Sequence, residues 1–206
     1  MADAGTTKVS GVLLAAGASE RFGDRNKLLI EIDGVPLIRR VAEHLLASRL
    51  AETVVVTGFE PDNIKNALAG LDLRIAHNPD FQSGMASSLK CGIAAVDGAA
   101  SGAMIVLGDM PGVTTSLVDR LLDAFENEGG DKITFPVDES RRQGNPVIWP
   151  RRFFADMSSI TGDKGAKALI AANRDAVLEV TVDERAAFKD IDTRSDLSGW
   201  KMDGND

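Results

Sequence analysis

A run of small residues followed by two cations is the part of the sequence best suited to bind a phosphate. Residues 15–18 read Ala-Ala-Gly-Ala and directly follow an apolar run that begins at Val12. Small side chains let backbone N–H groups approach an anion closely, so such a loop can cradle phosphate oxygens. Arg21 adds a planar fork of donors, and Lys27 adds a compact, mobile charge. We therefore interpret residues 15–27 as a candidate phosphate-binding loop.

Two common glycine-loop motifs do not fit this segment. Lys27 is not followed by Ser or Thr, which excludes a Walker loop, and the glycines are misplaced for a dinucleotide fingerprint. A surface loop with solvated charges remains an alternative, because Glu20 and Asp24 reduce the net charge of the loop to only +1.

Asp109 is the candidate metal ligand. It follows the apolar run 104–107 by two residues, and Met110-Pro111 then turns the chain away, so its carboxylate should project from the carboxyl edge of a sheet. A carboxylate beside a phosphate-binding loop is favourable chiefly when Mg²⁺ bridges the two anions. A turn or helix-cap aspartate is the alternative interpretation.

Two more acidic residues, Asp190 and Asp192, lie near the end of the chain. Alternation places both on one face of an extended segment, so either could point into a site. The alternative is a helix cap before Ser195.

Short apolar runs alternate with helical segments, which is typical of βαβ units. The first, second and fourth apolar runs lack polar alternation, as expected for parallel strands covered on both faces. Strands are predicted at 12–15, 54–56, 73–75, 104–107, 132–137, 146–149 and 177–182, and helices at about 36–48, 61–69, 85–97, 115–128 and 163–173.

These elements predict an α/β fold: a three-layer, doubly wound, mostly parallel, Rossmann-like sheet. Short right-handed connections favour the order 3-2-1-4 for the first four strands. Strands 1 and 4 are then neighbours at the topological switch point, where ligands bind in such sheets. The glycine loop and Asp109 both leave these two strand ends. We expect one domain over residues 1–206, with frayed ends at 1–8 and 201–206.

Composition restricts the remaining function classes. The chain has 206 residues, 44% of them hydrophobic and 26% charged, with no apolar run long enough to span a bilayer. One cysteine permits no internal disulfide, and the N-terminus resembles neither a signal nor a transit peptide, so the cytoplasm is the expected location. A net charge of −8 argues against nucleic-acid and anionic-membrane partners. With two histidines, a His-rich metal site is excluded.

Three further segments are candidate ligand contacts. Residues 83–88 combine a glycine, three serines and a predicted helix start, although Ser83 could simply cap that helix. Residues 141–146 offer two arginines and an amide, and paired arginines are often only a solvated surface. Asp163 is positioned to cap the helix predicted from 163.

Six blocks in order resemble the signature segments of MobA-like nucleotidyltransferases, which share a fold with sugar-nucleotide pyrophosphorylases. The resemblance runs from about residue 9 to 197. The blocks are Leu14-Ala15-Ala16-Gly17 with Ser19, Arg21, Gly23 and Lys27-Leu28-Leu29; Asn78-Pro79 with Gly84-Met85-Ala86-Ser87-Ser88-Leu89; Leu107-Gly108-Asp109-Met110-Pro111; Gly144-Asn145-Pro146-Val147; Gly162-Asp163 with Gly165-Ala166; and Asp190-Ile191-Asp192-Thr193.

Within the family, the chain looks closest to the molybdenum cofactor cytidylyltransferases. Guanylyltransferase relatives typically carry Ala-Gly-Gly where this chain has Ala15-Ala16-Gly17, and the Gly84-Met85 block also resembles the cytidylyl branch. Arg194 departs from the pattern, since the family often has proline there.

The resemblance implies a Mg²⁺-dependent transfer of CMP from CTP to the phosphate of molybdopterin, with a molybdoenzyme or its chaperone as a further partner. It implies that Asp109 and Asp192 contact the metal and that Arg21, Lys27 and Asp109 are catalytic. The implied nucleotide contacts are Leu14, Ala15, Ala16, Gly17, Arg21, Lys27, Asn78, Ser83, Gly84, Met85 and Ser88, and the implied acceptor contacts are Gly144, Asn145, Pro146 and Asp163.

Three alternatives remain open at this point. One is transfer from GTP or another nucleotide, or to another acceptor such as a sugar phosphate. Another is a non-catalytic chaperone that holds the molybdenum cofactor, which would not need Arg21, Lys27 and Asp109. A nicotinamide-dependent oxidoreductase is weaker, because the dinucleotide glycine pattern is missing.

Overall fold

The structure is a computed structural model that describes residues 7–18, 22, 26–162, 165–183, 188–193, 195–196 and 200. The expected frayed end at 201–206 and most of the one at 1–8 lie outside these residues, as do Arg21 and Asp163.

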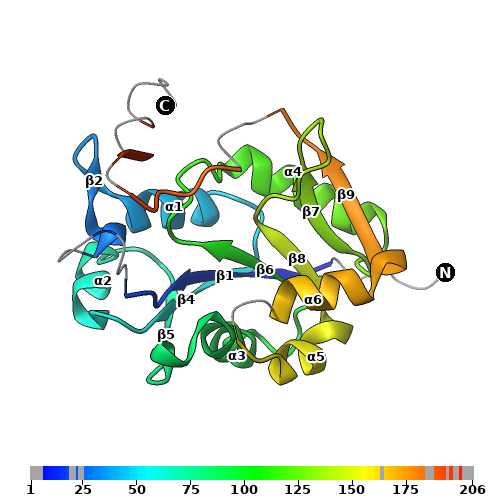
Figure 1. The fold of residues 1–206 in the computed structure, drawn as a ribbon, viewed down its shortest axis with the longest axis horizontal. Helices are drawn as coiled ribbons and strands as arrows, with labels where there is room; N and C mark the ends of the chain where they lie inside the picture. The colour runs from blue at the N-terminus through cyan, green and yellow to red at the C-terminus, as the bar shows by residue number, and fades with distance from the viewer. Residues whose placement is uncertain are drawn as a thin grey trace.

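A mostly parallel sheet forms the centre of the molecule (Figure 1). Among the described residues it has seven strands in the order β5-β4-β1-β6-β8-β7-β9. The first four run in the predicted order 3-2-1-4, and β8 pairs antiparallel with both of its neighbours. The strands are β1 (Val9–Ala15), β4 (Glu52–Thr57), β5 (Arg74–His77), β6 (Gly102–Leu107), β7 (Ile133–Val137), β8 (Val147–Pro150) and β9 (Val177–Thr181).

Helices cover both faces of this sheet, which confirms the predicted layers. Figure 1 shows α1 and α4 on one side and α3 and α5 on the other. The helices are α1 (Leu37–Leu46), α2 (Pro61–Ala67), α3 (Met85–Ala95), α4 (Thr115–Asn127), α5 (Phe154–Ser159) and α6 (Gly165–Ala172), with 3-10 turns η2 (Lys27–Leu29), η3 (Phe81–Ser83), η4 (Arg151–Phe153) and η5 (Arg174–Ala176).

Successive residues of a strand point to opposite faces of the sheet, so the strands contribute side chains to two hydrophobic cores, one on each face. Leu13 and Ala15 point into the core under α1, α2 and α4, whereas Val12 and Leu14 point into the core under α3 and α5. The apolar run at 12–15 is buried, as predicted for a strand covered on both faces, and β1 begins three residues earlier than predicted, with Val9, Ser10 and Gly11 buried as well.

Two features of the fold were not predicted. A hairpin joins β2 (Glu31–Ile32) to β3 (Val35–Pro36) through Asp33 and Gly34, both with positive φ. A short helix, α5, follows β8.

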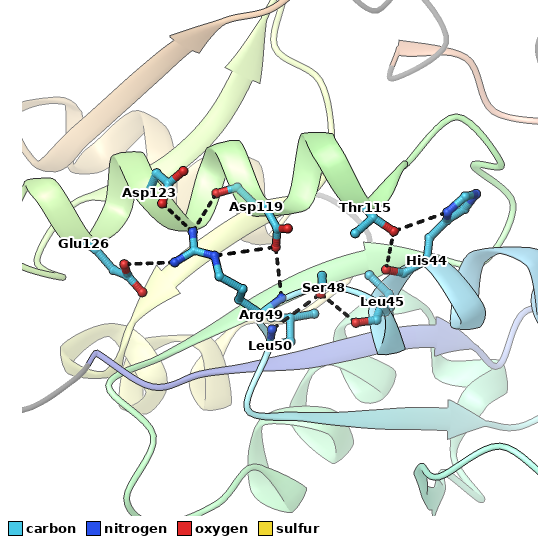
Figure 2. A network of polar contacts seen from close by, with 9 residues as sticks. All are labelled: His44, Leu45, Ser48, Arg49, Leu50, Thr115, Asp119, Asp123 and Glu126. Atoms are coloured by element: carbon cyan, nitrogen blue, oxygen red, sulfur yellow. Dashed lines mark hydrogen bonds and ion pairs between the residues drawn. The ribbon is translucent and has the colours of Figure 1, made fainter.

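Arg49 follows the end of α1 and contacts α4 between Asp119 and Glu126. Figure 2 shows its guanidinium between the side chains of Asp119, Asp123 and Glu126, with its backbone N–H donating to Asp119. The Thr115 hydroxyl donates to the carbonyl of His44 at 3.0 Å. These contacts hold α1 and α4 side by side on one face of the sheet. Among the described residues, no helix has the length and apolarity needed to cross a membrane.

Candidate active site

The carboxyl ends of β1 and β6 form the base of the site. The two strands pair in parallel, with Leu14 opposite Leu107, so the segments that follow them leave the same edge of the sheet. The N–H of Gly108 donates to the carbonyl of Leu14 at 3.0 Å. A Cβ at Gly108 would lie 2.9 Å from that carbonyl oxygen, so glycine is required for the two segments to approach this closely. Asp109 is thereby held beside the glycine loop.

Lys27 reaches this edge from the turn η2. The Asn26 side chain accepts a hydrogen bond from the Leu28 N–H, and the Leu28 side chain is buried, so both sides of Lys27 are anchored. The Lys27 ammonium lies 2.6 Å from Asp109 Oδ2. The structure therefore brings together the predicted cation and the predicted carboxylate, 82 positions apart in the chain.

Asp192 joins them from the C-terminal segment. The N–H of Ile191 donates to the backbone carbonyl of Asp109 at 2.9 Å, and the Ile191 side chain is buried in the core under α1 and α4. These two contacts place Asp192 Oδ1 2.6 Å from the Lys27 ammonium. Asp192 is not the cap of the following helical turn, because Thr193 and Asp196 exchange hydrogen bonds there.

The ammonium of Lys27 thus bridges two carboxylates in a partly buried place. The exposed side-chain fractions of Lys27, Asp109 and Asp192 are 15%, 18% and 21%. Burial alone lowers the pKa of Lys27, but the charges and hydrogen bonds of Asp109 and Asp192 outweigh it, so the pKa is raised and the ammonium stays protonated.

The two carboxylates also fit a divalent cation. Asp109 Oδ1 is buried and has no hydrogen-bond partner in the part of the chain that the structure describes, so it is an oxygen available to a cation. No cluster of three or more His, Cys, Asp or Glu side chains occurs among the described residues. Mg²⁺ commonly binds one or two carboxylates and takes its other ligands from water and substrate phosphates, which matches this pair.

A cleft of about 760 Å³ opens in front of this group. It is large enough for a ligand of nucleotide size. Among the residues predicted to bind nucleotide or metal, the cleft is lined by Leu14, Ala16, Gly17, Lys27, Gly84, Met85, Ser88, Asp109 and Asp192.

Among the described residues, three predicted nucleotide contacts lie outside the lining of the cleft. Ala15 is buried in the core, and the Ser83 hydroxyl donates to the carbonyl of Asp80. Asn78 is buried, and its amide donates to the hydroxyls of Ser87 and Ser88 at 2.8 and 3.0 Å. Asn78 therefore ties the end of β5 to the first turn of α3, which faces the cleft.

A smaller pocket of about 130 Å³ adjoins the cleft, since Leu107 and Asp190 line both. It contains the predicted acceptor residues Gly144 and Asn145, whereas Pro146 is not part of its lining. Arg142 also lines it, with its guanidinium 5.1 Å from the centre of the Phe188 ring.

Sequence reasoning missed several lining residues. Phe81, Gln82, Leu28, Leu107 and Ala18 line the cleft next to predicted positions. Phe81 and Gln82 lie between the two parts of the Asn78-to-Leu89 block, so the spacing of that block could have indicated them. Alternation places Asp190 on the same face as Asp192, and both residues line the cleft.

Comparison with known proteins identifies the family. The MobA-like NTP transferase domain family matches residues 11–177. The chain is 31% identical over 198 residues to nicotine blue oxidoreductase of Paenarthrobacter nicotinovorans, covering 94% of this chain and 96% of that protein. It is 29% identical over 196 residues to a molybdenum cofactor guanylyltransferase of Cupriavidus metallidurans, covering 92% of each.

Solved structures agree with these matches. The crystal structure of Rv0371c from Mycobacterium tuberculosis has a TM-score of 0.84 and 25% identity, covering 95% of this chain and 98% of that one. Rv0371c in complex with manganese gives a TM-score of 0.81 at 23% identity, covering 95% and 99%. CMP:2-keto-3-deoxy-manno-octonic acid synthetase complexed with CTP shares the fold, with a TM-score of 0.74 at 16% identity over 95% and 97% of the two chains.

The predicted family is thus confirmed, and so is the predicted three-layer, mostly parallel fold, which is the nucleotide-diphospho-sugar transferase fold. The chain belongs to the MobA-like NTP transferase domain family, and it is an enzyme of the nucleotidyltransferase class.

Proposed function

We propose that this enzyme transfers CMP from CTP to the phosphate of molybdopterin, with Mg²⁺ as cofactor and pyrophosphate as the second product. The observation that carries the proposal is the meeting of Lys27, Asp109 and Asp192 at the switch point of the sheet, in front of a cleft of about 760 Å³. The reaction would take place in the cytoplasm, and a molybdoenzyme or its chaperone would receive the product.

The glycine loop and Lys27 would hold the triphosphate. Gly17 and Ala18 line the cleft next to Lys27, so backbone N–H groups and one ammonium can face the same phosphate oxygens. Arg21, in the same loop, is proposed as a second cation. These donors would offset the charge that grows on the leaving pyrophosphate.

Asp109 and Asp192 would hold the metal. When bound, Mg²⁺ supplies Lewis-acid stabilisation of phosphate oxygens and orientation of the α-phosphoryl group. The acceptor's own phosphate is the nucleophile: one of its oxygens forms a bond to the α-phosphorus while the bond from that phosphorus to the β-phosphate oxygen breaks. That phosphate is already ionised near neutral pH, so the chain needs no protein nucleophile and no strong general base.

The choice of CTP over GTP is supported by the residues of the glycine loop. Ala16 lines the cleft and stands where guanylyltransferase relatives typically carry glycine. Gly84 and Met85 line the same cleft and resemble the cytidylyl branch. The guanylyltransferase names among the relatives make GTP the competing substrate.

The deciding experiment is a product assay with molybdopterin, Mg²⁺ and either CTP or GTP, read by mass spectrometry and by pyrophosphate release. We expect CMP linked to molybdopterin and one pyrophosphate for each transfer. A clear preference for GTP would overturn the cytidylyl assignment. Tight binding of the cofactor without pyrophosphate release would instead favour a carrier.

A second candidate is oxidoreduction of a heterocyclic dye, because the match to nicotine blue oxidoreductase covers nearly the whole of both chains. The missing dinucleotide fingerprint speaks against tight binding of a nicotinamide cofactor. Titration with NADH followed by fluorescence, and then bleaching of nicotine blue in its presence, separates this candidate from nucleotidyl transfer.

A further inference from the structure

The Lys27 ammonium occupies the position between the two carboxylates that are proposed to hold the metal. It lies 2.6 Å from Asp109 Oδ2 and 2.6 Å from Asp192 Oδ1. The other oxygen of Asp109, Oδ1, is buried and has no hydrogen-bond partner among the described residues, so it is the oxygen of this residue that Lys27 leaves unused. Because the two oxygens belong to one carboxylate, an ion that binds Asp109 through either of them lies close to the Lys27 ammonium.

A divalent ion on these carboxylates is disfavoured while the ammonium is bonded to them. Mg²⁺ needs ligand oxygens at roughly 2.0–2.1 Å, and two cations on one carboxylate would lie only a few ångströms apart and repel each other. In a place where the side chains are about one-fifth exposed or less, water screens this repulsion weakly.

The backbone of Lys27 is fixed, but its ammonium has another place to go. Asn26 and Leu28 anchor the turn, and Lys27 itself lines the same cleft as Gly17. Its four-carbon stem allows the ammonium to turn from the carboxylates toward an anion in that cleft. A triphosphate arriving there would provide such an anion.

We propose that Lys27 is a built-in competitor of the divalent ion, so that the carboxylate pair accepts the ion readily only together with a polyphosphate. This inference rests on the proposed function, because it takes Asp109 and Asp192 as the metal ligands. Without nucleotide, Lys27 neutralises the pair and keeps affinity for the free ion low. With nucleotide, the phosphates draw Lys27 away and release the carboxylates, so ion and nucleotide favour each other's binding.

The test is a titration of the full chain with Mn²⁺ alone, with free Mn²⁺ followed by electron paramagnetic resonance. We expect Lys27→Met to lower the Mn²⁺ dissociation constant at least about tenfold relative to the natural chain, because the competing charge is removed. Lys27→Arg keeps a cation and should keep the weak binding. An unchanged or weaker affinity in Lys27→Met overturns the proposal.

Lys65→Met is the matched control, since it removes the same charge from the exposed face of α2, where Lys65 pairs with Asp62. Its Mn²⁺ affinity should equal that of the natural chain. If Lys27→Met does not fold, Lys27→Gln carries the same expectation, because its amide can still donate to the carboxylates without a charge.

A second substitution distinguishes this inference from the proposed function. Adding Asp109→Asn to Lys27→Met should abolish the gained Mn²⁺ affinity. If the affinity rises in Lys27→Met but survives Asp109→Asn, the ion binds elsewhere and the metal role of Asp109 in the proposed function is wrong. If Asp109→Asn alone weakens Mn²⁺ binding while Lys27→Met does not strengthen it, only the competition is wrong.

Discussion

The charged side chains of Lys27, Asp109 and Asp192 come from distant parts of the chain and meet in one partly buried site. Each of them reduces the electrostatic cost of burying the others. Asp109 and Asp192 would repel each other without a cation between them, and Lys27 would be costly to bury without an anion. The 2.6 Å contacts satisfy both requirements. A residue at this site therefore contributes to binding chemistry and to local electrostatic balance together, and substitutions must be chosen to separate the two.

Asp109→Asn is the substitution that achieves this separation best. The amide keeps the size of the side chain, and Asp192 still pairs with Lys27, so the fold should persist. Loss of the carboxylate should lower pyrophosphate release by roughly 10²–10³-fold or more, because charge stabilisation in the transition state is removed. Asp123→Asn, on the exposed side of α4, is the control and should retain normal turnover. A near-normal rate for Asp109→Asn would remove Asp109 from the mechanism.

The sequence predicted which residues gather at the candidate site better than it predicted the contacts that those residues make. Small residues after a buried strand, and a carboxylate after its neighbour, predicted that Lys27 and Asp109 lie near each other. The direct bridge by Lys27 was not predictable, because it depends on the Ile191 backbone bond that brings in Asp192 from 165 positions away. Asn78 was predicted at the ligand, but burial turns its amide toward Ser87 and Ser88.

The helix α3 links the packing of the sheet to the shape of the cleft. Its first turn supplies Met85 and Ser88 to the cleft, while Gly92 faces the sheet. A Cβ at Gly92 would lie 2.4 Å from Val12 Cγ1 and 3.1 Å from Val56 Cγ2, so α3 can pack this closely only because the side chain is absent. The distance between α3 and β1 is thus set by a residue about one turn beyond Ser88, outside the lining of the cleft.

We expect Gly92→Ala to lower the free energy of unfolding by about 1–3 kcal/mol, because overpacking must displace α3 or the strand residues. Urea denaturation measures the loss. Gly98→Ala is the control, since a Cβ there meets nothing within 4 Å, and its effect should stay within about 0.5 kcal/mol. Equal stability of the two variants would show that α3 has room to adjust.

The sequence predicted the positions of most helices and strands well. It predicted less well which strands pair and in which direction. The predicted helix at 115–128 is α4, at Thr115–Asn127, because an apolar face recurs every turn and Thr114 accepts a hydrogen bond from the Leu117 N–H. The hairpin of β2 and β3 was missed, although Asp33-Gly34 is a recognised turn pair. The antiparallel direction of β8 could also have been predicted from the sequence. A parallel crossover needs about a dozen residues or more, and the segment between β7 and β8 is shorter than that.

For the whole molecule, the stability of the fold depends on pH through its ionisable side chains. The net charge is −8, and several carboxylates depend on being ionised. Burial raises the pKa of Glu52, but hydrogen bonds from the Asp97 N–H, the Ser10 hydroxyl and Arg74 outweigh it, so its pKa is lowered from 4.5. Glu52 thereby joins β1, β4 and β5 at the edge of the sheet opposite the cleft.

Acidification should therefore destabilise the fold. A carboxyl whose folded pKa is lowered contributes stability that is fully present above its unfolded value and is lost as pH falls through the folded value. The pKa of His44 is lowered by burial and by Arg40, so its neutral form is favoured and its contribution is lost as pH falls below 6.5. Protonation of Glu52 and protonation of His44 therefore both lower the free energy of unfolding as the pH falls.

Urea denaturation at pH 7, 5.5 and 4 should show a falling free energy of unfolding. Glu52→Gln should be less stable than the natural chain at pH 7 and should lose less stability between pH 5.5 and 4. A parallel pH dependence of the two proteins would show that Glu52 is not a source of the effect.

The bond from the Ile191 N–H to the Asp109 carbonyl has a consequence for biosynthesis. β1, β4, β5 and β6 all precede Asp109 in the chain, so the part of the sheet that carries this carboxylate is synthesised long before Asp192 is. The two carboxylates therefore become available in a fixed order. The paired centre can form only once Ile191 has docked on the Asp109 carbonyl and has carried its neighbour toward Lys27.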